Sequence, residues 1–209
     1  MNEVTCVWQI PALLGEGPLW VAGENALYWV DILQRQVHRL EPASGHKCSW
    51  TFAEPITSLG QRQSGGFVGT TPDGFVTVDL ETQTLAPIVL PEAHLPHNRF
   101  NDGKVDGYGR YWSGSMNKQE REASGTLYRL DPDLSLHTMD GDYIITNGPA
   151  FSVDGTTMYH NDSIKGFVYA FDLQKDGTVG GKRPFTKLTF SENGAPDGMT
   201  VDSENCLWL

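Results

Sequence analysis

Four short segments of the sequence place Glu, Asn or Asp beside Gly or Pro, and these residue types could do chemistry. The segments are LGEGP at 14–18, RFNDGKVDGYGR at 99–110, TNGPAFSVDG at 146–155 and APDGMTVD at 195–202. They offer carboxylate and amide oxygens without thiolate or imidazole, which suits a hard divalent cation such as Ca²⁺, Mg²⁺ or Mn²⁺. Taken singly, each segment is more often a turn, because Asn-Gly, Asp-Gly and Glu-Gly-Pro occur where a strand stops or φ is positive. A site therefore requires a fold that brings the segments together.

Several other signatures are missing or incomplete in the sequence. No G-x-x-x-x-G-K-[ST] loop occurs, and GYGRYW at 107–112 lacks the third glycine of a dinucleotide loop. No serine lies in a G-x-S-x-G nucleophile elbow. The loop that starts at Asp172 has Arg183 where an EF-hand needs Glu, and a proline separates His94 from His97. We interpret the first of these as a hairpin turn and the histidines as a loop pair.

The elements that would position the four segments are predicted to be β-strands. Helical periodicity is almost absent, and short apolar or aromatic runs are bounded by Gly, Asp, Asn and Pro throughout. A strand-turn-strand unit recurs as ALYWVDILQRQVHRL at 26–40, GGFVGTTPDGFVTVDL at 65–80, GRYWSGSM with GTLYRLDPD in 109–133, and DGTTMYHNDSIKGFVYAFDL at 154–173. The chain is therefore predicted to be all-β.

The repeats have a period that is typical of a β-propeller. Their anchor residues are spaced by 39, 44, 47 and 49 residues, and they are Trp29, Val68, Trp112, Tyr159 and Trp208. Periods of about 40–50 residues with several strands each are the signature of propeller blades. A β-sandwich with hairpins of similar length is the alternative. We also expect the tryptophans at positions 20, 29, 112 and 208 to lie in blade cores rather than to form a sugar platform.

In a propeller, the loops that enter the innermost strands converge on one mouth of the central channel. The four polar segments fall at comparable places in different repeats, so their side chains can meet there. The 209 residues hold a little over four repeats, and CLWL at 206–209 begins another. We expect one propeller domain over residues 1–209, with four to five blades present and an incomplete C-terminal end.

Composition limits the partners. The chain is 39% hydrophobic and 20% charged, and its net charge of −11 makes nucleic acid and anionic membranes unfavourable partners. The N-terminus has no basic region of a signal peptide, and no apolar run is long enough for a membrane span. Cys6, Cys48 and Cys206 are odd in number and far apart, which indicates reduced thiols and a cytoplasmic location.

The four segments together resemble the gluconolactonase, regucalcin (senescence marker protein) and sugar-lactonase family. The residues that carry the resemblance are LGEGP, RFNDGKVD-x-x-GR-x-W-x-G-x-M, TNGPAFSVDG-x-x-x-Y-x-x-DS and PDGM-x-VD, which run from end to end of the chain. Within the family, the chain looks most like bacterial aldonolactonases such as xylonolactonase. The resemblance implies a six-bladed propeller of which about two blades are absent from these residues.

The resemblance also implies a site. It implies that Glu16, Asn147 and Asp197 bind one divalent cation, Ca²⁺ first, with Mg²⁺, Mn²⁺, Zn²⁺ or Fe²⁺ as alternatives. It assigns Arg99 and Asn101 to substrate contact. Some members carry a further substrate-contacting acid three residues after the methionine that matches Met116; this position is Gln119 here, with Glu120 next to it.

The function expected from this site is metal-dependent hydrolysis of a sugar lactone such as gluconolactone or xylonolactone, a carboxylic-ester hydrolase activity. Hydrolysis of a cyclic ester needs a polarised carbonyl, an activated water and a stabilised oxyanion. Asp197 would serve as general base in addition to its role as a ligand. The alternatives are a cation-binding propeller that acts as a buffer or scaffold without catalysis, and an esterase for a different ester on the same site.

Overall fold

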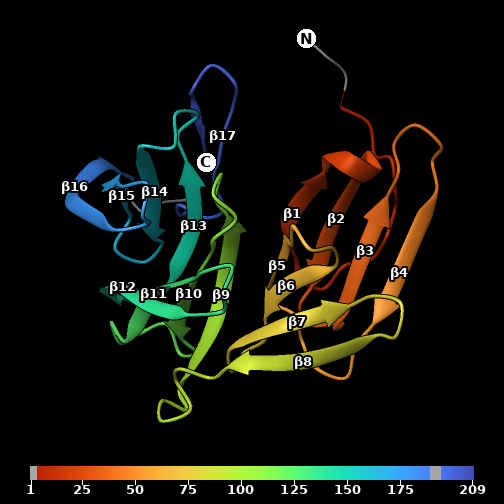
Figure 1. Ribbon diagram of the computed structural model, residues 1–209, viewed down its shortest axis with the longest axis horizontal. Helices are drawn as coiled ribbons and strands as arrows, with labels where there is room; N and C mark the ends of the chain where they lie inside the picture. The colour runs from red at the N-terminus through yellow and green to blue at the C-terminus, as the bar shows by residue number, and fades with distance from the viewer. Residues whose placement is uncertain (1–3, 189–193) are drawn as a thin grey trace.

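The computed structural model describes residues 4–188 and 194–209 and consists of antiparallel sheets arranged around a common centre (Figure 1). The first sheet contains β1 (Gly15–Val21), β2 (Ala26–Asp31), β3 (Gln36–Leu40) and β4 (Lys47–Thr51). The second contains β5 (Ser58–Gln61), β6 (Phe67–Thr70), β7 (Phe75–Asp79) and β8 (Thr84–Val89). The third contains β9 (Asn98–Val105), β10 (Tyr111–Asn117), β11 (Gly125–Leu130) and β12 (Leu136–Tyr143).

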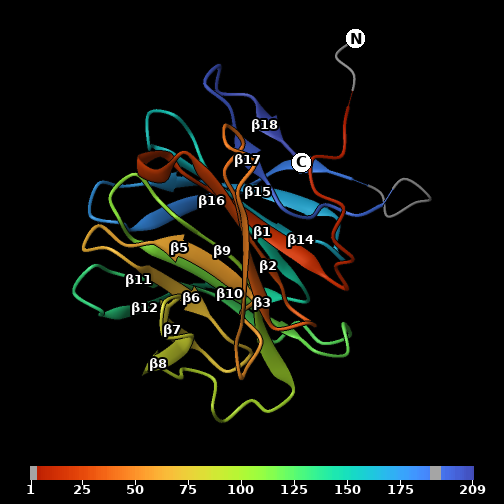
Figure 2. The same ribbon diagram turned by 90° about the vertical axis from the view of Figure 1, so that its right-hand side faces the viewer.

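The fourth sheet contains β13 (Thr146–Phe151), β14 (Thr157–Asp162), β15 (Phe167–Leu173) and β16 (Val179–Lys187). A two-stranded sheet of β17 (Thr200–Val201) and β18 (Leu207–Trp208) follows, and Figure 2 shows it next to the fourth sheet. The one helical element of the described residues is the 3₁₀ turn η1 (Ala22–Glu24). No helix in residues 4–188 or 194–209 has the length and apolar character to span a membrane.

This arrangement is a β-propeller, as the repeat predicted. Each four-stranded sheet is a meander in sequence order, and the first strands β1, β5, β9 and β13 lie side by side at the centre (Figure 1). The predicted strand-turn-strand units are the second and third strands of each blade. The described residues thus form four blades and one further pair of strands, within the predicted four to five blades.

The apolar core lies between neighbouring blades, where the facing sides of adjacent sheets pack against each other. Tyr28 and Phe67 pack between blades one and two. Phe75 and Phe100 pack between blades two and three, and Trp112 belongs to the cluster between blades three and four. Smaller apolar residues, Ala150, Val168 and Met199, join blade four to the β17–β18 pair.

The tryptophans do not all follow the predicted core role. Trp112 is fully buried, but Trp20 is 51% exposed and Trp208 is 63% exposed. Trp29 is half-buried against Trp8, with ring centroids 5.2 Å apart. The physical reason is alternation along a strand: side chains of successive residues point to opposite faces. In blade one the neighbouring Tyr28 takes the buried position.

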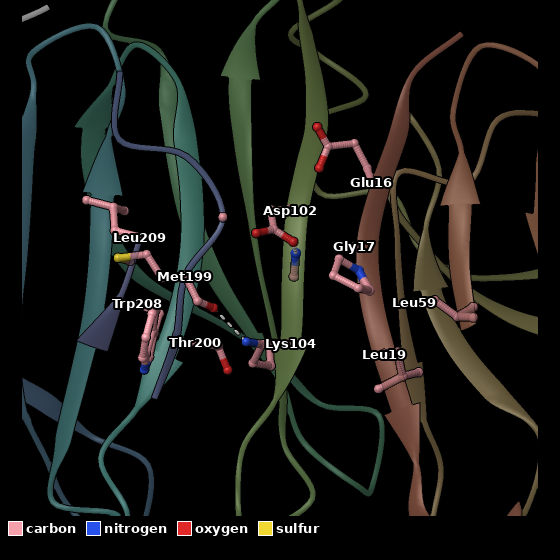
Figure 3. Close-up of a pocket in the computed structure, with 13 residues that line it drawn as sticks. Glu16, Gly17, Leu19, Leu59, Asp102, Lys104, Met199, Thr200, Trp208 and Leu209 are labelled. Carbon is pink, nitrogen blue, oxygen red and sulfur yellow. Dashed lines mark hydrogen bonds between the residues drawn. The ribbon is translucent and has the colours of Figure 1, made fainter. Parts of the chain in front are cut away.

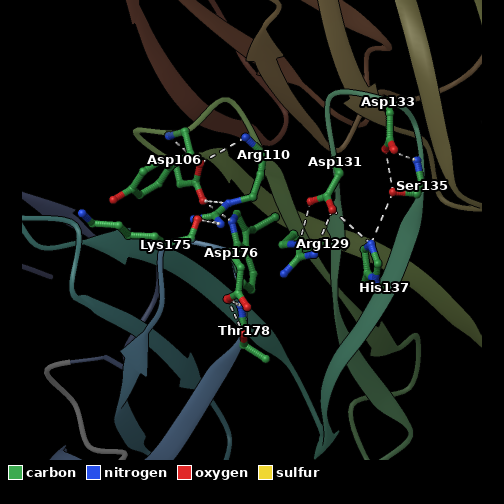
Figure 4. Close-up of polar contacts among 12 residues, drawn as sticks. Asp106, Arg110, Arg129, Asp131, Asp133, Ser135, His137, Lys175, Asp176 and Thr178 are labelled. Carbon is green, nitrogen blue, oxygen red and sulfur yellow. Dashed lines mark hydrogen bonds and ion pairs between the residues drawn. The ribbon is translucent and has the colours of Figure 1, made fainter.

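A polar network fixes the third blade against the fourth (Figure 4). The Asp106 carboxylate accepts hydrogen bonds from Arg110 Nε at 2.6 Å and from the indole Nε1 of Trp112 at 2.9 Å. Arg110 Nη1 also donates to the carbonyl of Lys175, in the turn between β15 and β16, at 3.0 Å. The two blades joined here are those that carry Asn101 and Asn147.

We expect Trp112→Ala to destabilise the fold strongly. Its indole is fully buried and hydrogen-bonded, so truncation leaves a cavity and removes one hydrogen bond from the Asp106 carboxylate, costing about 3–5 kcal/mol of unfolding free energy. Trp20→Ala is the matched control because its indole is half exposed, and its cost is about 1 kcal/mol or less. Denaturant unfolding measures both. Equal costs for the two variants would contradict this description of the core.

Candidate functional site

The innermost strands of blades one and four are bulged immediately after a predicted ligand. In β1, Glu16 pairs with Val30, and the pairing resumes only at Leu19 with Tyr28. In β13, Asn147 pairs with Asn161, and the pairing resumes only at Ala150 with Tyr159. In each bulge a Gly-Pro dipeptide, 17–18 or 148–149, faces one residue of the neighbouring strand, and the two glycines have φ of +57° and +79°. Such a bulge bends the strand and redirects the preceding side chain, and only glycine adopts these angles cheaply.

The innermost strand of blade three has a bulge of its own. In β9, Phe100 pairs with Ser115 and Gly103 pairs with Ser113, so two residues, Asn101 and Asp102, face one residue of β10. The bulge changes the alternation, and Asp102 and Lys104 line a cavity of about 410 Å³ that Glu16 also lines. In blade two, β5 pairs with β6 in continuous register. None of the described residues of this blade lines the cavity around the predicted site residues.

Buried aspartates accept hydrogen bonds from the backbone just before β1 and just before β13. Asp31, at the end of β2, accepts hydrogen bonds from the backbone N–H groups of Leu13 at 2.8 Å and Leu14 at 3.2 Å. Asp162, at the equivalent end of β14, accepts from Ile144 N at 2.9 Å. Both carboxylates are fully buried, and each lies opposite the residue before a predicted ligand. The sequence analysis did not assign this role. The available signal was the aspartate that recurs at the end of the second strand in both blades.

These strands place five predicted residues around one cavity of about 290 Å³. The five are Glu16, Arg99, Asn101, Asn147 and Asp197. Asn147 is buried, whereas Glu16, Arg99 and Asn101 are partly exposed and Asp197 is exposed at the cavity rim. Three separate blades and the segment before β17 contribute them, so residues distant in sequence converge as the propeller geometry requires.

The predicted substrate residue Gln119 lies outside the lining of this cavity. Its side chain is exposed, and its backbone N–H donates to Asn117 Oδ1 at 3.1 Å. The neighbouring Glu120 lines the cavity instead and has a left-handed φ of +57°. The tight turn after β10 therefore brings in the residue four positions after Met116 rather than three.

A chain of hydrogen bonds orients the amides of the site. Arg99 Nη1 donates to Asn101 Oδ1 at 2.9 Å, and Asn101 Nδ2 donates to Asn147 Oδ1 at 2.8 Å. Asn147 Nδ2 in turn donates to Ser163 Oγ at 2.9 Å. This directs the carbonyl oxygen of Asn147 toward Asn101, and a carbonyl oxygen has a second lone pair for a cation. Asn101 thus also contacts a predicted ligand.

The carboxylates of the site repel each other. Burial raises the pKa of Glu16 above its ordinary value and the charge of Asp197 raises it further, while the N–H of Gly17 and the charge of Arg99 oppose this. Deeper in the channel, burial raises the pKa of Asp102 to about 7, and burial lowers the pKa of Lys104. A divalent cation between Glu16 and Asp197 would remove this repulsion.

The residues present fit a hard divalent cation. Glu16, Asn147 and Asp197 offer two carboxylates and one amide oxygen, and the described lining contains no Cys or His. Oxygen donors of this kind favour Ca²⁺, Mg²⁺ or Mn²⁺ over softer metals. The mutual repulsion of two carboxylates in a partly desolvated cavity is the electrostatic feature that a cation would relieve.

The chain is similar in sequence to proteins of a known family. The model of the SMP-30/Gluconolactonase/LRE-like region matches residues 14–209. The chain belongs to this family. The 6-deoxy-6-sulfogluconolactonase of Pseudomonas putida is 35% identical over 209 residues, which cover 100% of this chain and 72% of that protein. Regucalcin of Gallus gallus is 37% identical over 213 residues, covering 99% of this chain and 71% of regucalcin.

Solved structures of the SMP-30/gluconolactonase family share the fold. A calcium-binding protein, regucalcin, from Agrobacterium tumefaciens superposes with a TM-score of 0.89 at 28% identity, over 97% of this chain and 68% of that one. A gluconolactonase from Xanthomonas campestris superposes with a TM-score of 0.79 at 25% identity, over 94% and 69% of the two chains. The resemblance seen in the sequence motifs is therefore confirmed.

Proposed function

We propose that the chain hydrolyses a sugar lactone to the aldonic acid, with one divalent cation held by Glu16, Asn147 and Asp197. The observation that carries the proposal is the convergence of these oxygen donors with Arg99 and Asn101 on one cavity. The names of two relatives, a sulfogluconolactonase and a gluconolactonase, support a lactone as substrate. The substrate we propose is an aldonolactone such as gluconolactone or xylonolactone.

The residues have separate tasks in the proposed mechanism. When bound, the cation would polarise the lactone carbonyl and offset the negative charge of the tetrahedral oxygen. Asp197, exposed at the cavity rim, takes a proton from water as the water oxygen bonds to the carbonyl carbon. The ring C–O bond then breaks, and the ring oxygen takes the proton back from Asp197 and leaves as a hydroxyl, which restores the Asp197 carboxylate. Arg99 and Asn101 orient the sugar hydroxyls.

A cation-binding protein without catalysis is the second candidate. The specific observation for it is that a structural relative is described as a calcium-binding protein. The same three ligands would serve both functions, so cation binding alone does not distinguish them. Calcium as the native ion and the cytoplasm as the location both stay predictions.

The test is a screen of the metal-reconstituted chain against five- and six-carbon aldonolactones. Ring opening releases a carboxylic acid, so acid release measured by a pH indicator follows the reaction. Turnover of at least one lactone above the spontaneous rate, and its loss on chelation, is the expected result. Tight cation binding with no lactone opened would favour the non-catalytic candidate.

We also propose Glu120 as the acid that contacts substrate, in place of Gln119. Glu120 lines the cavity and its charge acts on the pKa of Arg99, whereas Gln119 does not line the cavity. We expect Glu120→Gln to raise the KM for the lactone about tenfold, the effect of one charged hydrogen bond. Gln119→Ala is the matched control and should leave kcat and KM unchanged. The reverse pattern would return the role to Gln119.

A further inference from the structure

A second cavity, of about 410 Å³, lies next to the candidate site, and Figure 3 shows the residues that line it. Glu16 lines both cavities, so the two adjoin. Asp102 and Lys104 of β9 line the second cavity together with Met199. None of these three residues has a role in the proposed mechanism, although Asp102 and Lys104 are ionisable and line the cavity.

Asp102 holds the backbone beside Asn147. Its Oδ2 accepts a hydrogen bond from Gly148 N at 3.2 Å, and its Oδ1 accepts from Gly103 N at 2.7 Å. Gly148 is the left-handed residue of the β13 bulge, and a Cβ there would lie 2.5 Å from Met199 Cε. The carboxylate thus fixes the first residue after a proposed ligand, where the chain leaves the regular ladder.

Lys104 holds the backbone beside Asp197. Its Nζ donates to the carbonyl of Met199 at 2.7 Å, as the dashed line in Figure 3 shows. Met199 follows Asp197 by two residues and packs against Ala150 and Val168 of blade four. From the other side, Asn161 Nδ2 donates to the carbonyl of Asp197 at 2.6 Å. The segment that carries Asp197 is therefore held from β9 and from β14.

We propose that Asp102 and Lys104 form a brace, two positioning residues on one strand that set the separation of Asn147 and Asp197. The brace rests on the proposed function only in taking these two residues as cation ligands. Partners of this kind orient the ligands of a metal site, and losing one typically costs about 10–100-fold in metal affinity or activity. Asn147 lies in β13 and Asp197 in the segment before β17, so contacts between these two parts of the chain are required to fix the separation of the ligands.

The test is Lys104→Met in the full chain, which keeps most of the aliphatic stem and removes the donor. We expect Mn²⁺ or Ca²⁺ affinity, measured by calorimetry, to fall about tenfold. In the metal-free protein, we expect faster amide hydrogen exchange in peptides that cover 195–203. Lys104→Arg keeps a donor and should recover most of the affinity. Lys47→Met is the matched control, because Lys47 Nζ also donates to a backbone carbonyl, that of Val7 at 2.8 Å, on an exposed surface.

A second variant tests Asp102, the other residue of the brace. Asp102→Asn keeps the shape of the side chain and should speed exchange in peptides that cover 146–150. A folded Lys104→Met protein with wild-type cation affinity and wild-type exchange would overturn the brace. If the wild type binds the cation but opens no lactone, the proposed function fails alone, because titration and exchange still measure the brace.

Discussion

Replacing Asp197 by Asn is expected to remove lactone turnover while leaving a measurable share of cation binding. An amide oxygen still coordinates a cation, but it does not accept a proton from water at neutral pH. Loss of a general base typically lowers kcat about 10²–10⁴-fold. Cation affinity should fall by less, since Glu16 and Asn147 remain in the same cavity. Kinetics at saturating metal, together with calorimetric titration, separate the two effects.

The control for this variant is Asp73→Asn, which removes the same charge from an exposed Asp-Gly turn between β6 and β7. It should retain both turnover and cation affinity. If Asp197→Asn kept the kcat of the wild type at saturating metal, Asp197 would have no role as a base. Its part in the site would then be limited to cation binding.

Replacing Glu16 by Gln is expected to abolish tight cation binding, and turnover with it. Glu16 is one of two carboxylates among the three proposed ligands, and it lies on the bulged β1 strand that points it into the cavity. Loss of this carboxylate should weaken cation affinity by about 100-fold or more, beyond the usual effect of a supporting residue. Calorimetric titration of the purified variant measures it.

The Glu16→Gln protein should fold at least as well as the wild type without metal. Burial and the charge of Asp197 raise the pKa of Glu16, so the native state disfavours its ionised form. Removing that charge removes the repulsion. Glu54→Gln, in the exposed loop between β4 and β5, is the control for a change in net charge alone. Equal cation affinity in the two variants would exclude Glu16 as a ligand.

The blade pattern could be predicted from the sequence because it is local. Each strand-turn-strand unit has its own alternation of residues and its own turn, so hairpins such as β2–β3 and β14–β15 were found where the structure has them. The convergence of the polar segments on one cavity also follows from blade order alone. The single-domain prediction for residues 1–209 stays a prediction.

The finer placement of side chains could not be predicted, because it depends on register. Gln119 and Glu120 are adjacent, and only the left-handed φ of Glu120 decides which of them lines the cavity. Likewise, Asp102 faces the channel because β9 carries a bulge, which regular alternation does not predict. Trp208 was predicted in a blade core and is exposed, whereas the adjacent Leu207 packs against the core, because successive side chains of a strand point to opposite faces.

In the proposed function, the cavity formed by Glu16, Asn147 and Asp197 opens lactones only with a divalent cation bound. The most direct measurement is the rate of aldonolactone opening by the chelator-treated chain as Ca²⁺, Mg²⁺ or Mn²⁺ is added back. Without metal we expect no activity above the spontaneous rate, and on addition of metal we expect a rise that saturates at the affinity found by calorimetry. A lactone-opening rate that persists unchanged in the metal-free chain would contradict it.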